Sequence, residues 1–149
     1  MLIDQSRYTK IYSKDIATDA YLVCNEIRKI LDLLKIKFSL DSDKCFDIKV
    51  ILGELMQNSI KHGNECDKSK TISVEIWFRD DCRGLEITVK DQGCGFEVPE
   101  PKQLSMNKVL KCDPLNMDES GRGLLIVNEL CDSIKFNSVG NAITVLKRI

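Results

Sequence analysis

Apolar residues recur at helical spacing in three segments of the chain. The first runs from Asp15 to Leu34, the second follows the candidate N-cap residues 41–43 and stops at Gly63, and the third covers residues 121–130. Apolar side chains at every third or fourth position form one stripe along a helix. The pattern therefore predicts three amphipathic helices, the second of which ends at a glycine.

Alternating apolar and polar residues predict strands around these helices. Two pairs of strands have turn residues between them, a polar turn at 79–84 and a Gly140-Asn141 turn. The expected strands are residues 7–13, 71–78, 85–89, 133–137 and 142–146.

The order β-α-α-β-β-α-β-β predicts the fold class, an α/β two-layer sandwich whose mixed, mostly antiparallel sheet is covered on one face by three helices. The length of 149 residues predicts a single domain spanning residues 1–149. Residues 97–120 hold all three prolines and show little periodicity. We expect a long loop there, and a long loop in a compact domain is usually functional.

Composition excludes several classes of function. The formal net charge of −1 gives no field that would attract nucleic acid or an anionic membrane. No apolar run approaches the roughly 18 residues of a membrane span, and the N-terminus has no apolar core of a signal peptide. Seven scattered cysteines and a single histidine disfavour a disulfide framework or a zinc site. We therefore expect a soluble, cytoplasmic protein with no direct nucleic-acid or membrane partner.

Three polar motifs interrupt the apolar pattern. In the second helix, Glu54, Asn58, Lys61 and His62 recur at helical spacing and border the buried face. A solvated helix flank explains this stripe when it is taken alone. A ligand with phosphates and cations would supply partners for these groups, which are costly to bury unpaired.

The other two motifs are rich in glycine. Asp91 begins the segment Asp-Gln-Gly-Cys-Gly-Phe, in which Gly93 and Gly95 let a ligand approach the backbone. The carboxylate of Asp91 is an acceptor for an exocyclic amine such as that of adenine. The third motif, residues 119–126, is a glycine-rich entry into an apolar helix, where free N–H groups favour phosphate. A tight turn and a hinge are the ordinary alternatives.

The order of the three motifs resembles one superfamily, the GHKL or Bergerat-fold ATPases. Within it the chain is most similar to the bacterial anti-sigma factor and switch-protein serine kinase family, over nearly the whole length. The resemblance implies a Bergerat ATP-binding fold with ATP and Mg²⁺ as cofactors. It also implies roles for three residues: Asn58 coordinates Mg²⁺, Glu54 is the general base and Asp91 reads adenine.

The resemblance also implies further cofactor-binding residues and an ATP lid at about 97–120. Pocket-forming residues would be Gly93, Gly95 and Phe96, phosphate-binding residues Gly121, Arg122, Gly123 and Leu124, and rim residues Lys61 and His62. In its C-terminal strand the family usually has a Gly-Thr pair that supports the adenine aspartate, whereas the turn of this chain reads Gly140-Asn141-Ala142. Thr144, further along the strand, is the candidate substitute. Glu119 stands where related kinases can carry an arginine, which weakens the case for efficient phosphoryl transfer.

The leading functional hypothesis is an anti-sigma-type regulator with serine/threonine kinase activity, which transfers the ATP γ-phosphoryl group to a serine of a partner switch protein. The alternative is an ATP-dependent module that binds a sigma factor with little or no turnover. A sensor histidine kinase is disfavoured because the chain lacks the required helical hairpin. The resemblance implies a sigma factor or an anti-anti-sigma switch protein as partner, and a homodimer is compatible with it.

Overall fold

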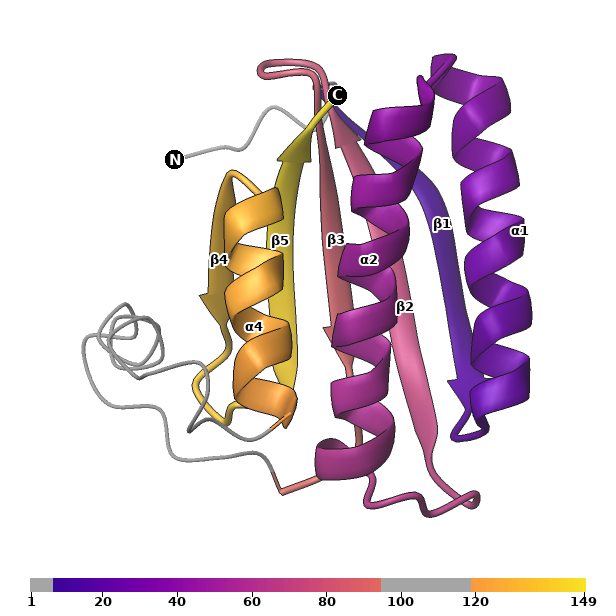
Figure 1. Ribbon diagram of the computed structural model, residues 1–149, viewed down its shortest axis with the longest axis vertical. Coiled ribbons are helices and arrows are strands. Elements are labelled where there is room, and N and C mark those ends of the chain that lie inside the picture. Colours follow the sequence, from indigo (N-terminus) through magenta and orange to yellow (C-terminus); the bar gives the residue numbers. More distant parts are fainter. Residues whose placement is uncertain (1–6, 95–118) are drawn as a thin grey trace.

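The computed structural model describes residues 7–94 and 119–149 of the chain. Within these ranges five strands form one sheet, and the helices α1, α2 and α4 cover one of its faces (Figure 1). The two-layer sandwich with three helices on one face is therefore confirmed. The strands are β1 (Tyr8–Ala17), β2 (Thr71–Arg79), β3 (Gly84–Lys90), β4 (Ser133–Phe136) and β5 (Ala142–Arg148).

The sheet order is β1-β2-β3-β5-β4, and each of its four pairs of neighbouring strands is antiparallel. The sequence predicts a mixed, mostly antiparallel sheet, whereas the described strands pair only in the antiparallel sense. The first strand is also longer than predicted. Ile16 was assigned to the first helix, but it pairs with Ile72 of β2, so β1 continues to Ala17.

Helix boundaries follow local capping. α1 (Ala20–Phe38) begins after Asp19, whose carboxylate accepts hydrogen bonds from the amides of Tyr21 and Leu22 at 2.9 and 3.2 Å. α2 (Ser42–Asn58) begins after Asp41, whose carboxylate accepts from the Lys44 amide at 2.8 Å. An N-cap side chain satisfies one of the amides that a helix start leaves unpaired. The predicted cap at 41–43 is thus Asp41.

The second helix changes character before it ends. Residues Ser59–Gly63 form a π-helical turn, η2, and the predicted stop at Gly63 is confirmed. The amide of Asn64 closes this turn by donating to the Ser59 carbonyl oxygen at 2.8 Å. π-Helical turns are rare and are frequent at functional sites.

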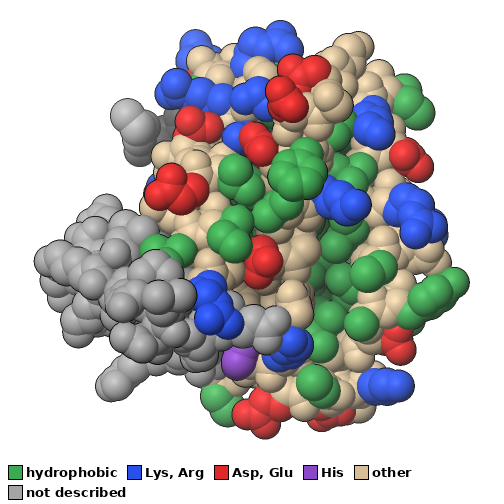
Figure 2. Space-filling view, in the orientation of Figure 1, with side chains coloured by type: hydrophobic (Ala, Val, Ile, Leu, Met, Phe, Trp, Pro, Cys, Tyr) green, Lys and Arg blue, Asp and Glu red, His purple; other side chains and the backbone are tan. Residues whose placement is uncertain are grey.

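The core lies between the sheet and the three helices. Apolar residues with no exposed surface come from α1, α2, α4 and the central strands, including Ile30, Leu34, Ile48, Ile51, Leu52, Leu55, Ile72, Val74, Ile76, Leu85, Ile87, Val127 and Val145. A space-filling view of the helical face shows apolar side chains in the groove between α1 and α2 (Figure 2). Burial of these side chains drives the packing of the helices onto the sheet.

α4 (Glu119–Leu130) is fixed at its C-terminal end by a buried lysine from β5. The Lys147 ammonium donates to the Leu130 carbonyl oxygen and to the Asp47 carboxylate of α2, the latter at 3.1 Å. A cation at a helix C-terminus pairs with the unsatisfied carbonyls there. This contact ties α4 to α2 and to β5. None of the described helices is both long enough and apolar enough to cross a bilayer.

Candidate nucleotide-binding site

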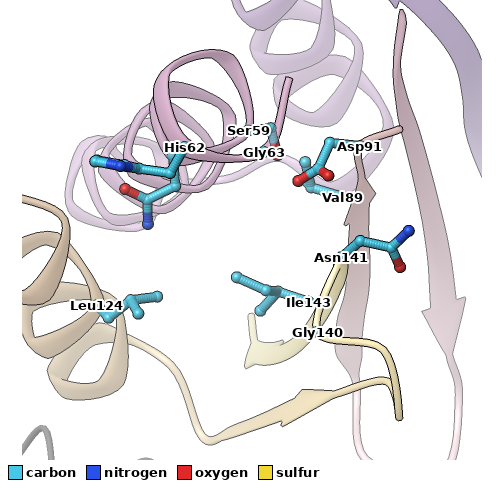
Figure 3. A pocket seen from close by; sticks show the side chains of 10 residues that line it. Ser59, His62, Gly63, Val89, Asp91, Leu124, Gly140, Asn141 and Ile143 are labelled. Carbon is cyan, nitrogen blue, oxygen red and sulfur yellow. The ribbon is translucent and has the colours of Figure 1, made fainter. Parts of the chain in front are cut away.

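The site lies where α2 and β3 end and α4 and β5 begin (Figure 1). A cavity of about 290 Å³ opens between these element ends (Figure 3). Its lining residues are Asn58, Ser59, His62, Gly63, Val89, Asp91, Leu124, Gly140, Asn141 and Ile143. Segments far apart in the sequence therefore meet at one cavity, which includes parts of all three motifs.

Asp91 directly follows β3 and is only 9% exposed. Its Oδ1 atom accepts a hydrogen bond from the Gly93 amide at 2.9 Å, and the Ser59 hydroxyl donates to the same carboxylate. Its own amide donates to the Asn141 carbonyl oxygen at 2.9 Å. Burial raises the pKa of Asp91 above its usual range, and the two donors together with the charge of Lys70 only partly oppose this effect. The result is a carboxylate that borders the cavity and has capacity for a further donor.

Two glycines make room for this carboxylate. A Cβ atom on Gly63 would overlap the Asp91 carboxylate, and a Cβ on Gly93 would overlap the Gly63 carbonyl oxygen. Only glycine fits at such close approaches. Gly93 was predicted to shape the pocket, whereas Gly63 was predicted only to stop the second helix.

The polar stripe of the second helix is divided by the π-helical turn. Asn58 and His62 line the cavity, and the turn brings Ser59 and Gly63 to it as well. Lys61 is exposed on the same turn and does not line the cavity. The structure thus brings Asn58, His62 and Asp91 together and leaves Lys61 at the periphery.

Glu54 lies one helical turn before Asn58, at the contact between α2 and α4. A Cβ on Gly123 would overlap the Glu54 carboxylate, so these two residues are in close approach. Glu54 is half-buried and does not line the cavity. Gly123 is buried, Leu124 lines the cavity and Arg122 is exposed. α4 begins at Glu119, so Gly121 lies within its first turn rather than before it.

Thr144 lies away from the cavity. Its hydroxyl and that of Thr88 on β3 are 2.8 Å apart on the sheet face opposite the helices. Side chains alternate between the two faces of a strand, and the neighbouring Ile143 is the β5 residue that lines the cavity. We therefore leave Thr144 out of the site.

Part of the predicted site lies outside the described residues. Gly95, Phe96 and the predicted lid, apart from its last two residues, belong to this part. Residues 119 and 120 form the start of α4. Cys94 is the last described residue before the gap, and it is exposed.

Several residues that line the cavity were not predicted from the sequence motifs. Val89, Ser59 and Ile143 gave no signal of their own, because which residue of a strand or a π-turn faces a cavity depends on tertiary packing. Gly140 and Asn141 were recognised as a hairpin turn and as the counterpart of the family's Gly-Thr pair, but they were not predicted to line the site. That turn is held by the Asn137 side chain, whose oxygen accepts from the amides of residues 140, 141 and 142 at 2.7, 3.0 and 3.2 Å.

The arrangement fits a nucleotide with a magnesium ion. Val89, Leu124 and Ile143 provide apolar walls for a flat ring, and Asp91 provides an acceptor beside them. No group of three acidic, histidine or cysteine residues that could hold a metal occurs among the described residues. Mg²⁺ commonly keeps waters and substrate phosphates with only one or two protein ligands, so the Asn58 amide oxygen suits it.

Comparisons with known proteins agree with this geometry. The family model of the histidine kinase-like ATPase domain matches residues 19–147. An anti-sigma F factor of Clostridium perfringens (strain SM101) is 33% identical over 95 residues, 64% of this chain and 64% of that protein. An anti-sigma F factor of Oceanobacillus iheyensis is 27% identical over 114 residues, 72% of this chain and 71% of that protein.

A serine-protein kinase RsbW of Listeria innocua is 30% identical over 89 residues, 60% of this chain and 55% of that protein. The match to the C. perfringens protein thus spans slightly less than two thirds of that relative's length. The domain match covers the helices, the sheet from β2 onwards and every motif described above. The chain belongs to the family of histidine kinase-like ATPase domains, and it is similar within that family to anti-sigma factors.

Proposed function

We propose that the protein is an ATP-binding, anti-sigma-type regulator with serine/threonine protein kinase activity. The observation that carries the proposal is Asp91, a buried carboxylate of raised pKa that borders the cavity and faces two neutral donors. The exocyclic amine of adenine supplies a further N–H donor to such an acceptor. The names of the similar proteins, anti-sigma F factor and serine-protein kinase, support the regulatory and kinase parts of the proposal.

The remaining site residues have separate roles in this proposal. Asn58 would hold Mg²⁺, and the start of α4, with Gly121 in its first turn, would bind phosphates through unpaired backbone amides and the positive helix end, while Gly123 and Leu124 pack beside this end. Arg122 is an exposed cation at this helix end. Bound Mg·ATP would supply a transferable γ-phosphoryl group. The partner would be a sigma factor, an anti-anti-sigma switch protein that presents a serine, or both.

Glu54 is the proposed general base. Its carboxylate would take the proton from the partner's serine hydroxyl while the serine oxygen bonds to the γ-phosphorus and the bond from that phosphorus to the β,γ-bridging oxygen breaks, which releases ADP. Glu54 lies one helical turn from Asn58, so base and metal ligand are neighbours along α2.

One observation favours the alternative, an ATP-dependent binding module with little or no turnover. The Glu54 carboxylate lies against Gly123 and not in the cavity wall. A carboxylate held beside α4 and outside the cavity wall is less suited to accept a proton from a substrate bound in the cavity. Glu119, at the place where related kinases can carry an arginine, supports the same alternative.

A phosphorylation experiment separates the two functions. The purified protein, immobilised and incubated with host extract, Mg²⁺ and γ-labelled ATP, is compared with Glu54→Gln and with Glu129→Gln. Glu129 is an exposed residue of α4 and provides a matched change of charge. For a kinase, the retained partner becomes labelled on serine or threonine with wild type and Glu129→Gln, and Glu54→Gln slows labelling by about 100-fold or more.

Equal labelling by wild type and Glu54→Gln would contradict the assignment of Glu54 as base. A partner that is retained only with ATP and carries no label would support the binding module. A protein that does not bind Mg·ATP in titration calorimetry would overturn both.

A further inference from the structure

Asn64 directly follows the π-helical turn and is fully buried, with 0% of its surface exposed. The backbone N–H of Asn64 donates to the Ser59 carbonyl oxygen at 2.8 Å, and its backbone carbonyl oxygen accepts from the Asp67 amide at 2.9 Å. Neither the sequence motifs nor the proposed chemistry uses this residue. A buried polar side chain with no role in the cavity needs an explanation of its own.

The Asn64 side chain joins three segments that are distant in the sequence. Its Nδ2 group donates to the Thr18 hydroxyl oxygen at 2.8 Å and to the Thr71 carbonyl oxygen at 3.0 Å. Its Oδ1 atom accepts from the Gln92 amide at 2.8 Å. The orientation of the amide is fixed, because the Thr18 hydroxyl proton is donated to the Lys70 carbonyl oxygen at 2.7 Å.

The two ends of this side-chain amide bind different parts of the molecule. The Nδ2 group joins Thr18, the residue after β1, to Thr71, the first residue of β2. The Oδ1 side holds Gln92, the residue between Asp91 and Gly93. Gln92 is held a second time, since its side-chain oxygen accepts from the Thr71 amide at 2.7 Å.

The turn at residues 91–93, which the Asn64–Gln92 bond holds, includes Asp91, the proposed acceptor for adenine. Gly93, which follows Gln92, donates its amide to Asp91 and lies against the Gly63 carbonyl oxygen. Gly63 and Asp91 are neighbours in the cavity wall (Figure 3). A shift of Gln92 would therefore move the donor to Asp91 and the packing around its carboxylate together.

We propose that Asn64 is a positioning residue of the nucleotide site, which holds the Asp91–Gly93 turn in place through the Gln92 amide. The inference rests on the proposed ATP binding for its functional meaning. The claim that Asn64 fixes the conformation of this turn does not depend on nucleotide binding, so it is tested on the protein without nucleotide.

The test compares Asn64→Ala with Thr18→Val. Thr18 is 2% exposed and belongs to the same network. Its replacement by the isosteric valine removes the bond from the Asn64 Nδ2 group to the Thr18 hydroxyl and leaves the Nδ2 bond to Thr71 and the Gln92 bond in place.

The first measurement is amide hydrogen exchange of residues 92 and 93 by NMR without nucleotide. Asn64→Ala should speed exchange at both amides by about tenfold or more, because the Gln92 amide loses its acceptor. Thr18→Val should leave exchange at these amides within about twofold of wild type, relative to the change in global stability. Equal acceleration in Asn64→Ala and Thr18→Val would overturn the inference, since it would reveal only a loss of overall stability.

The second measurement is the dissociation constant of Mg·ATP, with Mg·GTP for comparison. Asn64→Ala should weaken ATP binding by about tenfold and reduce the preference for ATP over GTP, whereas Thr18→Val should change neither. Unchanged ATP affinity in Asn64→Ala would overturn the positioning role. Absence of ATP binding by the wild-type protein would instead overturn the proposed function, and the exchange data would still decide whether Asn64 controls the turn.

Discussion

Two carboxylates of this protein are buried to a similar degree, Glu26 between α1 and β1 and Asp91 beside the cavity, with 6% and 9% of their surface exposed. Glu26 accepts from the Lys14 ammonium at 2.6 Å and from the Tyr12 hydroxyl at 2.7 Å, and Lys29 lies at 3.4 Å. These partners lower the pKa of Glu26 to about 2.

Asp91 has two neutral donors, and burial raises its pKa. At Glu26 the lysines and the tyrosine outweigh the effect of burial, whereas at Asp91 burial outweighs the two donors and the charge of Lys70. A carboxylate with two cations and a hydroxyl has its acceptor capacity filled, so its role is to join a helix to a strand. A carboxylate with incomplete partners at a cavity wall is a marker of a ligand site.

The largest expected effect is that of Asp91→Asn on nucleotide binding. This variant keeps the shape of the side chain and removes the charge that an amine of the base would face. We expect ATP binding to weaken by about 100-fold, since a hydrogen bond to a charged group contributes about 1.5–3 kcal/mol. Titration calorimetry with Mg·ATP measures this, and unfolding in urea should show no loss of stability. Retained affinity would show that Asp91 is only another structural carboxylate.

Glu26→Gln should lower the stability of the fold and leave ATP affinity unchanged, the reverse of Asp91→Asn. Loss of the charge weakens the bonds to Lys14 and Tyr12, so we expect the free energy of unfolding to fall by about 2 kcal/mol. Urea denaturation followed by the fluorescence of Trp77, the single tryptophan, measures this loss. ATP affinity should be unchanged at temperatures where the variant is folded. A large change in affinity would mean that the two regions are coupled, and the comparison would fail.

Acidification should affect the two regions in different pH ranges. The pKa of Glu26 is lower in the folded protein than its ordinary 4.5, so its stabilising contribution is complete above about pH 4.5 and is lost as the pH falls towards 2. The pKa of Asp91 is raised, so Asp91 becomes protonated at a higher pH than Glu26 does. This protonation stabilises the folded protein, but it removes the carboxylate that would accept from the amine of adenine.

ATP affinity should therefore decrease with falling pH while the protein is still folded, by up to about tenfold per pH unit below the pKa of Asp91. Titrations of wild type and Asp91→Asn over the same pH series measure the effect, because the two proteins share every other titrating group, and so does the nucleotide in both titrations. Parallel curves for the two proteins would exclude Asp91 as the titrating group.

Much of the fold was predictable because burial imposes a period on the sequence. α2 and the β2-β3 hairpin have nearly the predicted bounds. The boundary between β1 and α1 was wrong because Ile16 fits a strand as well as a helix, and its pairing with Ile72, which is distant in the sequence, decides between them.

The site was predictable as far as its motifs extend. Asn58, His62, Asp91 and Leu124 meet at the cavity as the motifs suggest. Thr144 does not, because its direction depends on the register of β5 against β3. Asn64 and Glu26 were missed for a related reason, since their partners are distant in the sequence and neither residue belongs to a recognisable pattern.

The π-helical turn at Ser59–Gly63 has a consequence for which sequence changes this protein tolerates. Deletion of one residue from the turn would convert the hydrogen bond from Asn64 to Ser59 into the shorter spacing of a regular α-helix. The shortened turn could not keep Ser59, His62 and Gly63 at the cavity and Asn64 on Gln92 all at once. Insertions and deletions should therefore be selected against in this segment, so that its length is preserved during evolution.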